Sequence, residues 1–162
     1  MHRLTFNSGN PEFTEFELKV LEQRLEVTLP QSYIDLMRAS NGGYLEENLC
    51  IALQNPIPKN MDYYLGDRYW PLSTVAGVTT DQTNINSLLY TADTAWHWDV
   101  PKKLVAFDGD GHTWLAFDYR NINDSEPKIV FIESDDFTIY DIAKNFEEML
   151  KILVPESEAC PE

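Results

Sequence analysis

The sequence predicts a single α+β domain, in which an antiparallel sheet packs with N-terminal and C-terminal helices. Three observations favour this class: helical spacing of apolar residues near both ends, two apolar strands around an Asp-Gly turn, and no internal repeat or second core. The 162 residues and 43% apolar composition are sufficient for one continuous core. We expect the domain to span residues 1–154, and residues 155–162 to form a disordered acidic tail.

Two helices are predicted in the first quarter of the chain, over residues 14–26 and 31–40. Apolar side chains recur along both at helical spacing, namely Leu18, Leu21, Leu25, Tyr33, Leu36 and Met37. Pro30 separates the helices, because proline is tolerated only in the first turn of a helix. The second helix should end at the Asn-Gly-Gly sequence of residues 41–43, where glycine can adopt the left-handed conformation that closes a helix.

The middle of the chain carries weaker signals. We expect an extended segment over residues 44–53, a proline-rich loop over 55–60, a strand over 72–78 and a short helix over 84–91. Cys50 is interpreted as a small buried hydrophobic side chain, because no histidine stands in a recognisable partner motif. With Cys160 as the only other cysteine in the sequence, no disulfide framework is implied.

Residues 103–107 and 113–119 form the clearest pair of predicted strands. The sequence Asp-Gly-Asp-Gly at residues 108–111 lies between them, and these residue types favour the tight turn of a β-hairpin. A third strand is expected at residues 128–132. A C-terminal helix is predicted over residues 141–153 from the helical spacing of Ile142, Phe146, Met149, Leu150 and Leu153.

Several motifs occur in a recognisable order. They are Glu22-x-x-Leu25, Leu29-Pro30-x-x-Tyr33-x-x-x-Met37, Asn41-Gly42-Gly43, the hairpin with Trp114-Leu115-Ala116-Phe117-Asp118-Tyr119, and Phe146-x-x-x-Leu150. Together they resemble the SUKH superfamily, named after the yeast Smi and Knr cell-wall regulator and its bacterial relatives, over residues 12–153. The resemblance implies this fold and a binding role: many bacterial members are described as immunity proteins that block toxins, often nucleases, and eukaryotic relatives as regulatory interaction proteins.

Net charge is the most extreme property of the sequence. The 27 acidic and 12 basic side chains give a formal charge of −15. Such a chain is repelled by phosphate backbones and anionic lipids, so we expect neither nucleic acid nor membrane as a partner. The charge either serves solubility or attracts a basic protein. Without a long apolar run or a signal-peptide core, the protein is expected to be cytoplasmic.

Two aromatic segments are candidates for contact with a partner. Asp62, Tyr63, Tyr64 and Asp67 combine aromatic contact area with acidic side chains, and we predict that they bind a protein partner. A loop folded onto the sheet with its rings buried remains an alternative. Trp96-His97-Trp98-Asp99 is interpreted as a core strand with both tryptophans inward, in preference to a binding edge.

No catalytic, cofactor or metal site is predicted. The Asp-Gly cluster lacks the acidic residues that an EF-hand needs at its fifth and twelfth positions, and the common nucleotide, hydrolase and zinc motifs are absent. A hydrolase built on Asp108, Asp110 or Asp118 is therefore the least favoured hypothesis. The leading one is a non-catalytic immunity protein that binds a basic toxin domain, such as a nuclease. The alternative is a regulatory or scaffold module of the same fold.

Overall fold

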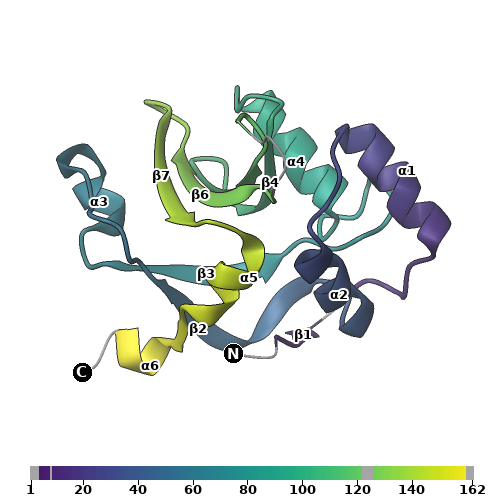
Figure 1. Ribbon diagram of the computed structural model, residues 1–162, viewed down its shortest axis with the longest axis horizontal. Helices are drawn as coiled ribbons and strands as arrows, with labels where there is room; N and C mark the ends of the chain where they lie inside the picture. The colour runs from purple at the N-terminus through teal and green to yellow at the C-terminus, as the bar shows by residue number, and fades with distance from the viewer. Residues whose placement is uncertain (1–3, 8, 122–125, 160–162) are drawn as a thin grey trace.

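The computed structural model describes residues 4–7, 9–121 and 126–159, which form two antiparallel sheets with helices around them (Figure 1). The first sheet has the order β1 (Phe6–Asn7), β2 (Gly43–Ala52) and β3 (Tyr69–Val75), and β8 (Leu153–Pro155) also pairs with β2. The second sheet consists of β4 (Leu104–Gly109), β5 (Thr113–Asp118), β6 (Lys128–Glu133) and β7 (Thr138–Ala143), in that order. The predicted α+β class with antiparallel pairing is confirmed, with two sheets where one was expected.

The first two helices lie close to their predicted limits, at α1 (Glu15–Leu25) and α2 (Gln31–Ala39). A capping box begins α1, since the Thr14 side chain accepts a hydrogen bond from the Glu17 backbone and the Glu17 carboxylate accepts one from the Thr14 backbone. The expected glycine cap of α2 is wrong, because an extended Ser40 follows the helix directly. Gly42, at φ +71°, instead turns the chain into β2.

The remaining helices are η1 (Lys59–Met61), α3 (Asp62–Leu65), α4 (Leu88–His97), α5 (Phe146–Lys151) and α6 (Glu156–Ala159). The predicted C-terminal helix over residues 141–153 is wrong at both ends. Ile142 lies in β7, where pairing with β6 fixes the segment, and Leu153 lies in β8. The Asn145 side chain starts α5 by accepting a hydrogen bond from the Glu148 backbone. Of the expected tail, residues 156–159 are helical, whereas 160–162 lie outside the described residues.

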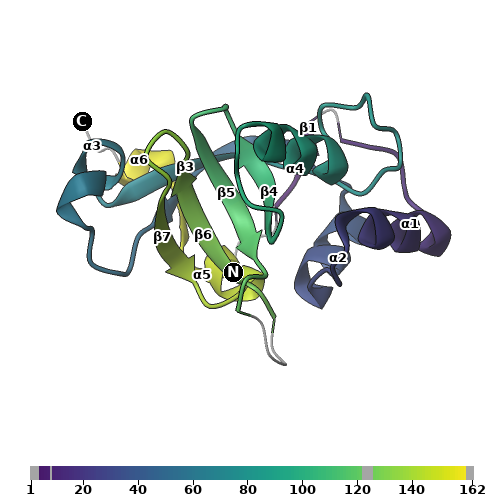
Figure 2. The same ribbon diagram turned by 90° about the horizontal axis from the view of Figure 1, so that it is seen from above.

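The second sheet is buried on both faces over most of β4, β5 and β6. Its inner face packs with the first sheet and with α1, α2 and α5, and the Tyr33 ring there lies 5.4 Å from Phe117 and 5.7 Å from Phe146 in edge-to-face contacts. Its outer face packs against the end of α4, which lies beside β4 (Figure 2). Burial on both faces explains why the central parts of β4, β5 and β6 are apolar runs in the sequence.

The segment Ala76–Val78, which follows β3, is hydrogen-bonded through all six of its backbone groups. Its partners come from α2, β4, the start of α4 and the loop before β2, namely Tyr33, Phe107, Asn86, Leu88 and Asn41. The buried Asn41 amide contributes two of these bonds, accepting from the Val78 N–H and donating to the Val78 carbonyl, each at 2.8 Å. This segment therefore fixes the helices and the second sheet relative to β3.

We predict that Asn41→Ala lowers the free energy of unfolding by about 3 kcal/mol, because it leaves both backbone groups of Val78 buried without partners. Urea unfolding at neutral pH measures the change. Gln31→Ala, which removes an exposed amide from α2, is the control and should change stability by less than about 0.5 kcal/mol. Equal effects of the two substitutions would contradict the structural role given to Asn41.

Candidate functional site

The residues predicted to bind a partner lie in and after α3, which projects at one end of the molecule (Figure 1). Tyr63 is 90% exposed, and Asp62 and Asp67 are exposed as well. Tyr64 is half-buried, with its ring 6.1 Å from Phe131 and 6.4 Å from Trp70. The segment thus combines one solvent-facing ring with another that packs onto the sheets.

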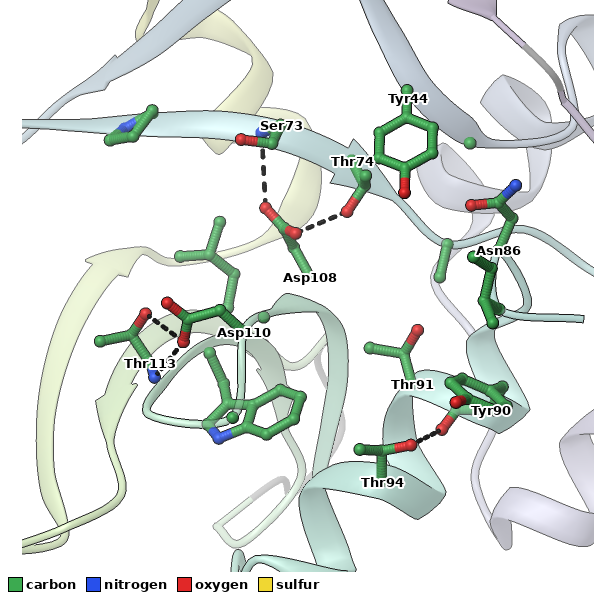
Figure 3. Close-up of a pocket in the computed structure, with 18 of the residues that line it drawn as sticks. Tyr44, Ser73, Thr74, Asn86, Tyr90, Thr91, Thr94, Asp108, Asp110 and Thr113 are labelled. Atoms are coloured by element: carbon green, nitrogen blue, oxygen red, sulfur yellow. Dashed lines mark hydrogen bonds between the residues drawn. The ribbon is translucent and has the colours of Figure 1, made fainter.

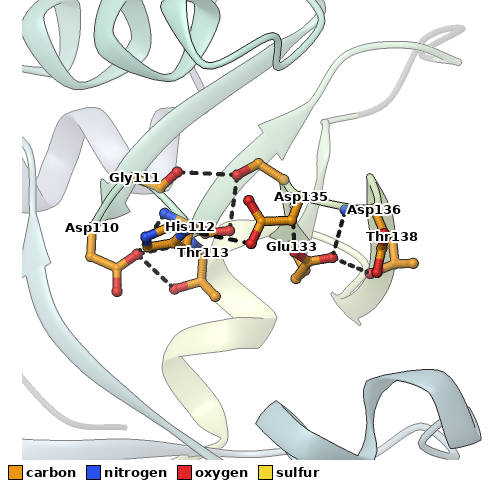
Figure 4. Close-up of polar contacts among 9 residues, drawn as sticks. Asp110, Gly111, His112, Thr113, Glu133, Asp135, Asp136 and Thr138 are labelled. Atoms are coloured by element: carbon orange, nitrogen blue, oxygen red, sulfur yellow. Dashed lines mark hydrogen bonds and ion pairs between the residues drawn. The ribbon is translucent and has the colours of Figure 1, made fainter.

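An acidic turn between β6 and β7 lies near Tyr64. The Glu133 carboxylate accepts hydrogen bonds from the backbones of Asp135 (2.8 Å) and Asp136 (3.1 Å), which holds the turn in shape (Figure 4). Asp135 also lies 3.5 Å from the Nδ1 atom of His112 in the neighbouring turn. Burial raises the pKa of Tyr64, and the negative charges of Glu133 and Asp135 raise it further. The acidic turn and α3 therefore form one negatively charged, aromatic surface.

A cavity of about 720 Å³ opens where β3 and β4 diverge. Directly after β3, the Ala76 N–H donates a hydrogen bond to the Phe107 carbonyl of β4, at 3.0 Å. Beyond a β-bulge at this point, the Asp108 side chain spans the gap, accepting from the Thr74 hydroxyl (2.5 Å) and the Ser73 N–H (3.4 Å). Helix α4 with the loop before it, the β4–β5 hairpin and the start of β2 supply the other walls (Figure 3).

The two aspartates of the predicted turn have different roles. Asp108 was predicted to lie in the turn, but it lies in β4 opposite Leu115. Burial raises the pKa of Asp108, although the hydrogen bonds from Thr74 and Ser73 oppose this shift. Asp110 shapes the turn through one carboxylate oxygen, which accepts from the backbones of His112 (3.0 Å) and Thr113 (2.9 Å). Partial burial alone would raise the pKa of Asp110, but these bonds hold it below its ordinary value.

The predicted core strand at Trp96-His97-Trp98-Asp99 is wrong, because α4 continues through His97. Ala92 and Ala95 form the buried stripe of this helix, at a spacing that belongs to a helix and not to a strand. Trp96 is half-buried and donates from its indole nitrogen to the Leu104 carbonyl at 3.0 Å. Trp98 follows the helix, is 50% exposed and lines the cavity.

Comparison with known proteins places this architecture in a family. A sequence profile of the SMI1 / KNR4 family (SUKH-1) matches residues 12–152. The chain belongs to this family. The SUKH resemblance of the motifs is thereby confirmed, and the match includes α3 and all the walls of the cavity. No curated protein matches the chain with significant similarity.

Several cavity residues of this SUKH-1 domain were missed in the sequence. Tyr44 is half-exposed in β2, and Tyr90, Thr91 and Thr94 lie on the face of α4 that turns toward β3 (Figure 3). In the sequence, the helical residues among them form a stripe of aromatic and hydroxyl side chains at helical spacing, which ends at Trp98. This stripe is visible only if the helix extends past residue 91, where the predicted helix stopped.

The three aspartates of the hydrolase hypothesis do not converge in the SUKH-1 fold. Asp118 lies at the end of β5 away from the cavity, where both of its oxygens accept from the Arg120 guanidinium at 2.9 Å. Burial alone would raise the pKa of Asp118, but Arg120 lowers it below its ordinary value. Asp118 therefore serves an ion pair at the far end of the strand.

Among the described residues, no three His, Cys, Asp or Glu side chains come together in a way that could hold a metal ion. Within the same residues, no helix has the length and apolar character needed to cross a bilayer. Cys50 is buried in β2, as predicted for a small hydrophobic side chain.

We predict that Asp108→Asn changes the pH dependence of stability. Because burial raises the folded-state pKa of Asp108, the wild-type protein loses stability as the pH rises from the ordinary value of 3.8 through the raised value. The variant lacks this titration, so its free energy of unfolding relative to wild type should increase between about pH 4 and pH 7. Urea unfolding at both pH values tests this, with the exposed Asp93→Asn as control. A constant difference at the two pH values would show that Asp108 titrates normally.

Proposed function

We propose that this SUKH-1 protein is a non-catalytic binding module that neutralises a toxin in the cytoplasm by binding it. Family membership over residues 12–152 carries the proposal, because the family resemblance implies immunity or regulatory binding. The net charge of −15 supports a basic partner, since complementary fields accelerate encounter. Each of the three aspartates of the hydrolase hypothesis accepts hydrogen bonds within the protein, namely Asp108, Asp110 and Asp118. This structural role supports binding rather than hydrolysis.

Asp62, Tyr63, Tyr64 and Asp67 are proposed to form part of the contact surface. Tyr63 offers a large exposed ring, and aromatic side chains of this kind contribute strongly to binding energy at interfaces. Asp62 and Asp67 add exposed negative charge on the same short segment. Trp70 connects this surface to the cavity, because it packs against Tyr64 and lines the cavity.

The direct test uses the toxic C-terminal domain of a secreted protein encoded beside this gene. Co-expression should restore growth to cells that produce the toxic domain, and the two purified proteins should form a stable complex. Growth arrest without complex formation would overturn the immunity proposal. A complex with a host protein that leaves the toxin unaffected would favour the regulatory module of the same fold.

We predict that association with the toxin domain is fast and sensitive to salt, near 10⁸ M⁻¹s⁻¹ at low salt against roughly 10⁵ to 10⁶ without steering. Asp62→Asn combined with Asp67→Asn should lower the association rate severalfold, whereas Tyr63→Ala should mainly raise the dissociation rate. Stopped-flow binding at several salt concentrations measures both rates.

The matched control for this prediction is Glu26→Gln combined with Asp35→Asn. It removes the same charge from exposed positions around α1 and α2, at the opposite end of the molecule from α3. The control should leave both rates nearly unchanged. Association that is slow and indifferent to salt would assign the net charge to solubility alone.

A further inference from the structure

We infer that the cavity between β3, α4 and the β4–β5 hairpin receives an arginine side chain of the protein partner. The inference rests on the proposed function, which supplies a basic protein as the ligand. Four independent features of the cavity walls lead to this assignment.

The first feature is the orientation of the threonine hydroxyl groups in the walls. Each donates its single proton to a group of the protein itself. Thr74 donates to the Asp108 carboxylate and Thr113 to the Asp110 carboxylate. Thr91 donates to the Ser87 carbonyl and Thr94 to the Tyr90 carbonyl. A hydroxyl that has donated its proton has only lone pairs left to offer. These four groups from three walls can therefore only accept hydrogen bonds from a ligand (Figure 3).

The second feature is negative charge on the walls of the cavity. Asp108 and Asp110 line the cavity, and none of the described residues that line it is Lys, Arg or His. One oxygen of Asp110 holds the turn, while the other has no hydrogen-bond partner among the described residues. An arginine guanidinium has five donors, no acceptor and a fixed positive charge, so it matches the four threonine acceptors and the two carboxylates of these walls.

The third feature is the aromatic rim. Tyr44 and Trp98 are each 50% exposed, and Tyr90 is exposed beside them on α4. Guanidinium groups stack on aromatic faces, and this contact strengthens as water is removed. Trp114 adds a buried indole N–H at the cavity wall that has no partner in the described part of the chain. A backbone carbonyl next to the arginine is the acceptor that a peptide ligand offers.

The fourth feature is the shape of the opening. A volume of about 720 Å³ exceeds that of one side chain and accommodates the residues that flank it. The exposed edge of β3 is poorly suited to pairing with an added strand, because Pro71 has no N–H and the Ser73 N–H is bonded to Asp108. Recognition at this site therefore depends on an inserted side chain.

The experiment uses the whole protein and the capped peptide acetyl-Gly-Arg-Gly-amide, titrated to about 10 mM, since a single side chain binds in the millimolar range. The indole N–H signals of Trp98 and Trp114 should shift in heteronuclear NMR spectra. Trp96 is an internal reference, because its indole N–H is bonded to Leu104 away from the cavity. The same peptide with citrulline, which is nearly isosteric and uncharged, should leave all indole signals unchanged.

Asp110→Asn is the test variant, since asparagine retains an acceptor for the turn but removes the charge. It should weaken binding of the arginine peptide about fivefold or more. Asp93→Asn, an equal charge change on the exposed side of α4, should leave the affinity unchanged. Should Asp110→Asn fail to fold, the comparison of arginine and citrulline on the wild-type protein decides alone.

Three outcomes overturn the inference: no indole shift with the arginine peptide, equal shifts with citrulline, or a lysine peptide that binds as well as arginine. The titration needs no toxin, so it separates this inference from the proposed function. If the cavity binds the arginine peptide but the protein does not bind the toxin domain, the arginine site is supported and the toxin proposal is contradicted. If the protein binds the toxin domain but the cavity does not respond to the arginine peptide, the proposed function is supported and the arginine site is contradicted.

Discussion

The backbone of Ala76–Val78 is the constraint on which the rest of the structure depends. Each of its six polar groups is paired, and an unpaired buried group costs about 1 to 3 kcal/mol, so the partners in α2, α4, β4 and the Asn41 loop are held in one arrangement. Gly77 makes this possible, since a Cβ there would lie 2.3 Å from the Asn41 carbonyl oxygen. The segment therefore holds β3, β4 and the start of α4, which line the cavity, in one arrangement.

The cavity arises where the backbone pairing around Ala76–Val78 ends. The Ala76 N–H, directly after β3, bonds to the Phe107 carbonyl of β4, and the two strands diverge from this point. The Asp108 carboxylate takes the place of the missing strand and satisfies the Ser73 N–H and the Thr74 hydroxyl. A carboxylate held in this way is removed from water, which raises its pKa. The same removal from water strengthens its attraction to a cation that enters the cavity. The Asp108 side chain, which spans the gap between the two sheets, is thus also a group that we infer to recognise the charge of the ligand.

Sequence patterns predicted the parts of the fold that local chemistry determines. The capping box at Thr14, the helical face through Leu21 and Leu25, and the strands around the Asp-Gly turn need only their own residues. Ile142 was misassigned because its spacing from Phe146 suits a helix, whereas pairing with a distant strand decides its state. The cavity could not be predicted for the same reason. Tyr44, Thr74, Tyr90 and Asp110 come from four separate segments, and only the packing around Ala76–Val78 brings them together.

The charge on the chain and the cavity act over different distances. The field of a −15 protein extends over roughly a Debye length, about 8 Å at physiological salt, so it attracts any basic surface and distinguishes poorly among them. The cavity acts only on contact, and its oriented acceptors distinguish a guanidinium from an ammonium or a neutral group. Trp70 lies between these two surfaces, in contact with Tyr64 on one side and the cavity on the other. In the proposed function, a basic partner drawn to the acidic surface around α3 would meet the inferred arginine site at its border, so this part of the protein would provide both rapid encounter and discrimination.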